Sequence, residues 1–254
     1  MTTAYFYSDT TALTGRSLRH ILRSPDTIIT TAVTPVALML IFVYVFGGAI
    51  DTGSESYLNF MLPGILLITI ASGIAYTSYR LFMDMQGGIF ERFQSMPIAR
   101  SSALWAHVLT SLVANMVSLA VVVGIAVVMG FRTGASPVAW LAVVGILGLF
   151  TLALTWVAVV AGLSAKTVDG AGAFAYPLIF LPFVSSAFVP TDTMPGPVQW
   201  FAENQPVTSI VNTIRDLFAQ QPVGNDIWIA LAWCVGILIA AYVAAGAVYR
   251  RKIR

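Results

Sequence analysis

The sequence predicts an all-α integral membrane protein with six membrane-spanning helices, and three observations support that fold class. Apolar residues make up 58% of the 254 residues and charged residues only 9%, against about 25% charged in an ordinary soluble domain. The apolar residues gather in six stretches, each with the ~20 residues that a helix needs to cross a bilayer core. Lys and Arg concentrate in alternate connections between these stretches. A chain with so few charges could not cover its surface in water, and a lipid solvent removes that requirement.

Each of the six stretches is expected to be a helix, because a backbone group without a hydrogen bond in hydrocarbon costs several kcal/mol. The third stretch is long enough to begin in the membrane interface, and the fifth is interrupted by Pro177 and Pro182. Together they form a single transmembrane domain over residues 1–254. The six expected spans cover residues 27–48, 58–81, 103–130, 137–163, 170–189 and 227–249.

The distribution of Lys and Arg orients the expected spans. With the N-terminus in the cytoplasm, the inner segments hold 11 of the 13 Lys and Arg residues, and the outer segments hold only Arg132 and Arg215. Cytoplasmic loops carry such an excess of positive charge. We therefore expect a multi-pass protein of the inner (cytoplasmic) cell membrane with both termini inside. The residues expected inside are Arg16, Arg19, Arg23, Arg80, Arg92, Arg100, Lys166, Arg250, Arg251, Lys252 and Arg254.

The N-terminal segment, residues 10–24, has the pattern of an amphipathic helix. Leu18 and Leu22 fall on one face of such a helix, and Arg16 and Arg19 fall on the other. This arrangement is typical of a helix that lies in the membrane interface. Anchoring by positive charge explains the pattern by itself, and a contact with a cytoplasmic partner is the alternative.

Two further segments lie outside the spans. Residues 87–100 place Phe90 and Phe93 on one side of a helix and Glu91 on the other, which predicts a short cytoplasmic helix parallel to the membrane. That helix is either a plain interfacial helix or an element that couples the spans to an ATPase. Residues 190–225 are rich in proline and too short in apolar residues to span, so they predict two short helices that dip into the outer leaflet as a re-entrant hairpin.

The sequence lacks the motifs of several kinds of catalytic and metal-binding site. No GxxxxGK[ST] phosphate-binding loop and no HExxH motif is present, and the single cysteine, Cys234, lies in an apolar stretch. The expected spans contain no acid–base pair of the kind that proton-coupled carriers use. Asn115 is their main strongly polar side chain, and such a residue more often joins helices than binds a ligand. We therefore expect no catalytic residue, no metal, no cofactor and no nucleic acid bound by this chain.

Two motifs resemble those of a known transporter family. Residues 91–98, ERFQSMPI, are similar to the ER-x-x-S/T-x-P signature of ABC-2 type permeases. Gln205-Pro206-Val207-Thr208, followed by Arg215, is similar to the NPLT…R pattern of the same family, with Gln205 in place of the usual Asn. The order of parts over nearly the whole chain also resembles the drug-efflux permeases of the daunorubicin-resistance type, which have the type V exporter fold.

The resemblance implies an exporter subunit for a hydrophobic or amphipathic drug or lipid. It implies a dimer of permeases, identical or related, on two cytoplasmic ATPase subunits that hold ATP and Mg. The residues that the resemblance places at the ATPase contact are Arg16, Arg19, Glu91, Arg92, Phe93, Gln94, Ser95, Met96 and Pro97. Those that it places along a substrate path are Thr69, Tyr76, Asn115, Phe174, Tyr176 and Phe180. The outer re-entrant motif comprises Gln205, Pro206, Thr208 and Arg215.

Three other functions compete with the exporter subunit. A secondary carrier that works without ATP should show ionisable residues inside the membrane, and usually internal repeats. A membrane enzyme needs a catalytic constellation. A membrane scaffold or assembly factor requires no particular motif, so the sequence does not exclude it. Copurification of a P-loop ATPase would distinguish an exporter subunit from it.

Overall fold

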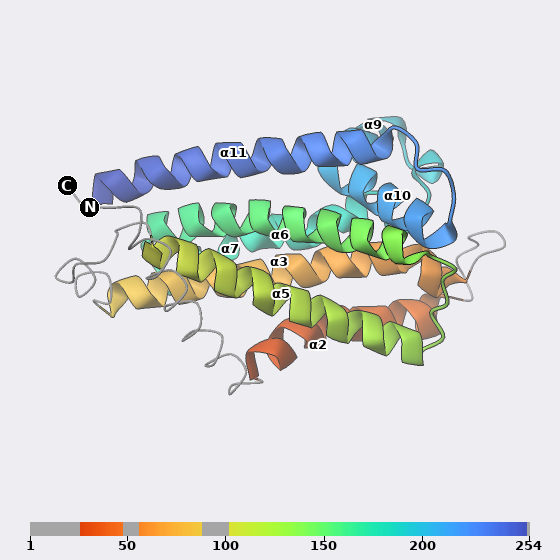
Figure 1. Cartoon of the computed structure of the whole chain (residues 1–254), viewed down its shortest axis with the longest axis horizontal. Coiled ribbons are helices and arrows are strands. Elements are labelled where there is room, and N and C mark those ends of the chain that lie inside the picture. Colours follow the sequence, from red (N-terminus) through yellow and green to blue (C-terminus); the bar gives the residue numbers. More distant parts are fainter. Residues whose placement is uncertain (1–25, 48–55, 88–101, 253–254) are drawn as a thin grey trace.

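The computed structural model describes residues 26–47, 56–87 and 102–252, and its regular elements there are all helices. Four of them are long and apolar enough to cross a membrane, and they agree with four of the expected spans. In Figure 1 these four helices run along the long axis of the molecule. They are α3 (Tyr57–Gln86), α5 (Ser102–Val128), α6 (Pro137–Ser164) and α11 (Asp226–Lys252).

The first expected span is a helix of two kinds. It begins as α2 (Asp26–Ile41), which contains Pro35, and continues as the π-helix η1 (Phe42–Phe46). Its apolar part, Thr31–Phe46, is shorter than the four long helices. One side of α2 packs against α3 and α5, and the aromatic ring of Phe42 stacks on that of Phe188 at 4.9 Å.

The fifth expected span is broken into short pieces, whereas residues 170–189 were expected to form one interrupted helix. The pieces are α7 (Val168–Ala173), α8 (Ala175–Phe180) and the 3-10 helix η2 (Leu181–Val184). Proline lacks a backbone N–H and cannot extend a regular α-helix, so it favours such breaks. Pro182 occupies the first turn of η2, where its missing N–H costs nothing.

A compact group of short helices follows at one end of the bundle. It consists of η3 (Thr191–Thr193), α9 (Gly196–Glu203) and α10 (Pro206–Ala219). Helix α10 packs against α3, α6 and α11, so this group covers the end of the bundle where α11 begins (Figure 1). The two helices α9 and α10, connected at Asn204 and Gln205, lie in the region expected to form a re-entrant hairpin.

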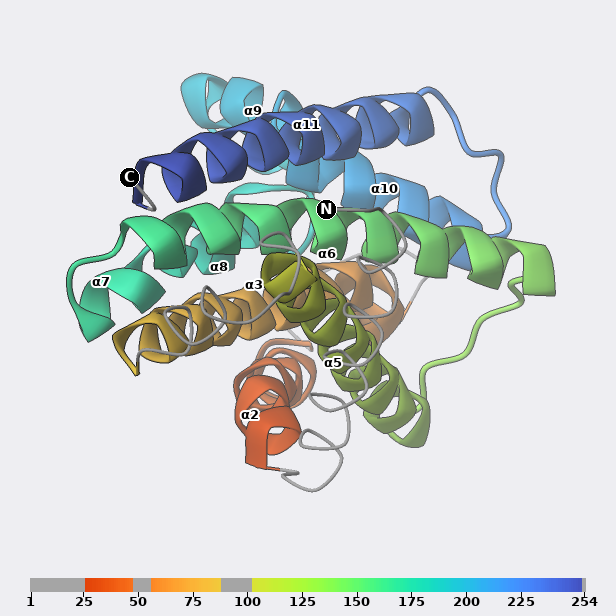
Figure 2. The same ribbon diagram turned by 60° about the vertical axis from the view of Figure 1, so that its left-hand side comes forward.

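Helix α3 is the centre of the fold. It contacts α2, α5, α6, α7, α8 and α10, and Figure 2 shows it between α2, α5 and α6. Small residues permit the close approach of its neighbours: a Cβ on Gly162 of α6 would lie 2.9 Å from the carbonyl oxygen of Ser78. Helix α11, by contrast, packs mainly on α6 and α10 among the described elements and leaves a long apolar face exposed.

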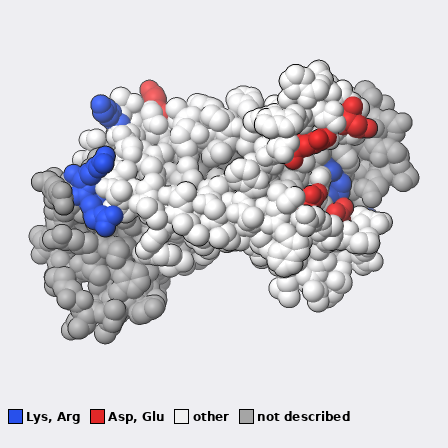
Figure 3. Space-filling view, turned by 90° about the horizontal axis from the view of Figure 1, so that it is seen from above, with Lys and Arg blue, Asp and Glu red and all other residues white. Residues whose placement is uncertain are grey.

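Charged side chains lie at the two ends of the bundle, and its middle is almost free of them (Figure 3). The end where α11 finishes carries Arg80, Lys166, Arg250 and Arg251, and we call it the basic end. The opposite end, which holds α9 and α10, is the hairpin end. An uncharged apolar band between two charged ends is the surface that a bilayer requires.

Candidate functional site

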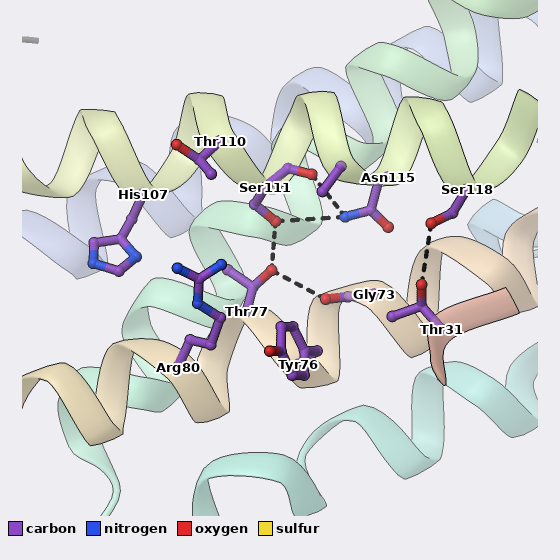
Figure 4. Close-up of a pocket in the computed structure, with 11 residues that line it drawn as sticks. Thr31, Gly73, Tyr76, Thr77, Arg80, His107, Thr110, Ser111, Asn115 and Ser118 are labelled. Carbon is purple, nitrogen blue, oxygen red and sulfur yellow. Dashed lines mark hydrogen bonds between the residues drawn. The ribbon is translucent and has the colours of Figure 1, made fainter. Parts of the chain in front are cut away.

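A polar cavity lies inside the helix bundle, between α2, α3 and α5. Its volume is about 30 Å³, which is room for one or two water molecules. Eleven residues line it, and most of them carry a hydroxyl, amide or basic group (Figure 4). Within an apolar bundle, such a concentration of polar side chains on three facing helices is the most distinctive feature of the interior.

Hydroxyl groups join the three helices around this cavity. The hydroxyl of Thr77 on α3 bonds that of Ser111 on α5, and also donates to the carbonyl of Gly73 at 3.0 Å. The hydroxyl of Thr31 on α2 lies 3.1 Å from that of Ser118 on α5. These hydroxyl contacts connect neighbouring helices in a part of the bundle where the described residues form no ion pair.

Asn115 is the polar centre of the cavity and is only 3% exposed. Its Nδ2 donates to the carbonyl of Ser111 at 2.9 Å, but its Oδ1 has no hydrogen-bond partner among the described residues. Gly73 of α3 faces this amide so closely that a Cβ at Gly73 would overlap Oδ1. The hydroxyl of Thr110 is a second buried polar group with no partner in the described part of the chain.

The cavity extends along the bundle toward its basic end. Arg80 and His107 line it there, while Thr31 and Ser118 lie at its other end (Figure 4). The guanidinium carbon of Arg80 lies 6.0 Å from the centre of the Tyr76 ring, a cation–π distance. His107 Nε2 lies 3.0 Å from a carboxylate oxygen of Asp84, which ties the basic ends of α3 and α5 together.

The structure brings only two of the six expected path residues into this cavity, namely Tyr76 and Asn115. Thr69 is fully buried elsewhere on α3, and its hydroxyl donates to the carbonyl of Ile65 at 2.8 Å. Phe174 packs partly buried against the main core, between α7 and α8. Tyr176 and Phe180 project from α8 and are 63% and 62% exposed, so they belong to the outer surface of this chain.

Sequence reasoning missed the residues of the cavity that carry hydroxyls. A signal for them exists on α5, where Ser111, Asn115 and Ser118 recur at i, i+4 and i+7 and therefore share one helix face. Thr77 and Thr31, on the facing helices, have no such pattern around them. The lesson is that a polar stripe in an apolar helix identifies the face but not its partners.

The outer motif forms a second polar cluster, which we call the outer clamp, centred on Arg215 of α10. Its guanidinium donates to the carbonyl of Phe60 at 3.0 Å and to the carbonyl of Ser186 at 2.8 Å. It also lies 3.8 Å from the centre of the Phe60 ring and within 3.4 Å of Asn212 Oδ1. The clamp thus holds α10 against the start of α3 and against the segment after η2.

The other residues of the motif shape the start of α10. The side-chain oxygen of Gln205 accepts from the backbone N–H of Val207, and its Nε2 donates to the carbonyl of Val184 at 2.9 Å. Pro206 occupies the first turn of the helix, where proline is favoured. Thr208 donates to the carbonyl of Ala202 and so links α10 to α9. All four motif residues therefore have structural contacts.

One acidic residue beside the clamp has a shifted pKa. Burial raises the pKa of the Asp216 carboxyl above its ordinary value, nearby Asp226 raises it further, and Arg215 acts in the opposite direction. Asp226 itself accepts from Asn212 Nδ2 at 3.0 Å. Negative charge is therefore disfavoured at Asp216 despite the adjacent cation.

The expected ATPase contacts lie outside the described residues. These are the interfacial helix over 10–24 with Arg16 and Arg19, and the coupling residues Glu91 to Pro97. Their sequence neighbours are described, however. Residues 88–101 join the basic end of α3 to the basic end of α5, the two helices that form most of the cavity. No cluster of residues that could hold a metal ion occurs in the described ranges.

Comparison with known proteins adds the family. The model of a family described as "ABC-2 type transporter" matches residues 8–219. The "Daunorubicin resistance ABC transporter permease protein DrrB1" of Streptomyces coeruleorubidus is 28% identical over 244 residues, which cover 93% of this chain and 84% of that protein. The "Probable doxorubicin resistance ABC transporter permease protein DrrC" of Mycobacterium tuberculosis is 30% identical over 250 residues, covering 97% and 90%.

Proposed function

The chain belongs to the ABC-2 type transporter family, and from that premise we propose that it is the membrane-spanning subunit through which a separate ATPase exports a hydrophobic or amphipathic compound. The observation that carries this proposal is the family match over most of the chain, together with two relatives matched nearly from end to end. Those relatives are named for daunorubicin and doxorubicin resistance. The proposed substrate class is accordingly a drug or lipid-like amphipathic molecule.

The proposed arrangement places six spans across the inner membrane with both termini in the cytoplasm. In this arrangement the four long helices are four of the six spans. The first span is α2 with η1, and the fifth is α7 with α8 and η2. The basic end then faces the cytoplasm, because positive charge accumulates on that side. Arg80, Lys166, Arg250 and Arg251 support this orientation, and the hairpin end faces outward.

Residues 88–101 are the proposed point of coupling to the ATPase. ATP and Mg would be held by two ATPase subunits, and this chain would pair with a second permease, identical or related. A push on Glu91 and its neighbours would reach α3 and α5 directly, because the segment joins their basic ends. Movement of these two helices would alter the cavity that they share.

The cavity itself is too small for a drug. Sites for drug-sized ligands measure about 300–1,000 Å³, whereas this one measures about 30 Å³. Passage of a substrate therefore requires α2, α3 and α5 to separate, and the structure corresponds to a closed path in this proposal. The hydroxyl links at Thr77 and Thr31 suit such opening, because each is a hydrogen bond between helices that water can replace.

The test is copurification followed by transport. Pull-down of the chain in mild detergent should bring a P-loop ATPase with it, identified by mass spectrometry. Inside-out vesicles that contain both proteins should accumulate doxorubicin when ATP is added, and vesicles given ADP serve as the control. Glu91→Ala should abolish ATP-dependent uptake while leaving the chain in the membrane. A chain that is recovered alone even after crosslinking, or uptake that is insensitive to ATP, would refute the proposal.

A further inference from the structure

A second concave region, distinct from the polar cavity, lies near the basic end on the outside of the bundle. It is a groove of about 370 Å³ between α5, α6 and α11, a size within the range of ligand sites of about 300–1,000 Å³. The residues that argue for a ligand are Trp105, Trp156, Tyr242, Gly246 and Arg250. The export path proposed above makes no use of it.

Three aromatic rings form the wall of this groove. Trp156 packs edge-to-face on Tyr242 at 4.8 Å and on Trp105 at 5.2 Å. An ordinary interfacial belt points its rings outward, but Trp156 is only 3% exposed. Its indole N–H is buried and has no acceptor among the described residues. The surface that this wall presents to the groove is therefore apolar.

One face of α11 forms the opposite side of the groove. Tyr242, Gly246 and Arg250 recur at i, i+4 and i+8 and share that face. Gly246 leaves a notch, since a Cβ there would have no atom within 4 Å. At 1.5 Å per residue the face extends for about 12 Å, less than half of the ~30 Å hydrocarbon core. A groove of that depth matches one leaflet, whereas a partner helix would need the full thickness.

The mouth of the groove carries positive charge. Arg250 lines it and is exposed, and no described carboxylate forms an ion pair with it. Arg251 follows directly in the last turn of α11. Basic pockets between membrane helices attract the headgroups of anionic lipids. The groove thus offers an apolar slot one leaflet deep with a cation at its opening.

From these features we propose that the groove between α5, α6 and α11 binds an anionic phospholipid of the leaflet at the basic end. One acyl chain lies along Trp105, Trp156 and the notch at Gly246, and the phosphate pairs with Arg250. A bound lipid at this position would extend the contact between α11 and α5, where the rings of Tyr242 and Trp105 already lie 6.2 Å apart.

Native mass spectrometry of the full chain, purified from membranes containing phosphatidylglycerol and phosphatidylcholine, tests the proposal. The wild-type chain should retain phosphatidylglycerol in preference to phosphatidylcholine. Arg250→Gln should weaken phosphatidylglycerol retention about fivefold, the value of one cation near the membrane surface. Arg251→Gln is the matched control, because Arg251 does not line the groove. It should keep the lipid.

A pair of glycine variants tests the slot independently of charge. Gly246→Leu fills the notch and should release the retained lipid, while Gly236→Leu, also in open space on α11 but away from the groove, should not. Leucine is a better helix former than glycine, so both variants should fold. Equal lipid retention in all variants would overturn the proposal. So would the release by Gly246→Leu of a second protein chain or of doxorubicin, with the lipid unchanged.

Discussion

The two polar clusters of this bundle differ in how completely their hydrogen bonds are satisfied. At the outer clamp, Arg215 engages two backbone carbonyls, an amide oxygen and an aromatic ring. In the polar cavity, Asn115 Oδ1 and the Thr110 hydroxyl are buried without partners among the described residues. Both clusters lie in apolar surroundings, where an unpaired polar group costs about 1–3 kcal/mol.

This difference separates a structural role from a functional one. A saturated cluster resists rearrangement, because every bond that breaks leaves another group unpaired. An unsaturated cluster beside empty space loses little when its helices move apart and gains when a ligand or water enters. We therefore assign the clamp to holding the hairpin in place and the cavity to the movement that transport requires.

The largest expected effect is at the clamp. Arg215→Met should lower the free energy of unfolding by about 3 kcal/mol, because the carbonyls of Phe60 and Ser186 lose their donor. Thermal unfolding in detergent and the amount of chain in the membrane would measure this effect. Arg132→Met is the matched control, since Arg132 is exposed and donates only to nearby carbonyls. An equal loss of stability in both variants would show that the contacts of Arg215 stabilise the fold no more than those of an exposed arginine.

The next effect is at Gly73, where α3 lies close to Asn115 of α5. Gly73→Ala should cost about 2 kcal/mol, because its methyl group overlaps the Asn115 amide and overpacking is destabilising. Asn115→Ala in the same chain should restore most of that stability. Gly124→Ala, which adds a methyl in open space on α5, is the control. A double variant no more stable than Gly73→Ala would show that the contact is not the cause.

A smaller effect on stability, with a larger one on transport, is expected at Asn115. Asn115→Leu removes hydrogen bonds that reach only Ser111 on the same helix, and an amide oxygen that is buried without a partner among the described residues, so folding should change little. ATP-dependent uptake of doxorubicin should nevertheless fall about tenfold, as the cavity loses its central polar group. Thr69→Val, on α3 but outside the cavity, should transport normally. Normal uptake by Asn115→Leu would show that the cavity has no role in transport.

The smallest effect concerns pH. The pKa of Asp216 is raised in the folded chain, so its contribution to stability is full at pH values below its unfolded pKa. That contribution is lost as the pH rises through the folded pKa. Asp216→Asn should therefore flatten the decline in melting temperature above about pH 4, the ordinary pKa of an aspartate. An unaltered profile in the variant would show that Asp216 does not titrate as its surroundings indicate.

The spans were predictable because their signal is local. Each helix must satisfy its own backbone hydrogen bonds in apolar surroundings, so α3, α5, α6 and α11 follow from apolar stretches. Pro177 and Pro182 predicted an interruption in the segment that forms α7, α8 and η2. The short pieces themselves depend on packing against α3, which no single stretch of sequence specifies.

The sites were less accessible because their contacts are distant in the chain. Arg215 was recognised by its motif, but its acceptor Phe60 lies 155 positions away. Thr69 and Thr77 both donate to the carbonyl four residues earlier on α3, so the sequence does not distinguish them. Only Thr77 also reaches Ser111, because it faces α5. A cavity is lined by residues of several helices, whereas the periodicity of a sequence shows only which residues share a face of one helix.

The hold of Arg215 on Phe60 also has a mechanical consequence. It pins α3 near its first turn, whereas the far end of the helix is attached to residues 88–101 and to α5 through Asp84 and His107. Helix α3 is thus a lever with its fulcrum at the hairpin end. Over a length of about 40 Å, a tilt of about 5° moves the basic end by about 3 Å. A small rotation at a fixed pivot, together with release of His107 from Asp84, would therefore be enough to part the hydroxyl contact between Thr77 of α3 and Ser111 of α5.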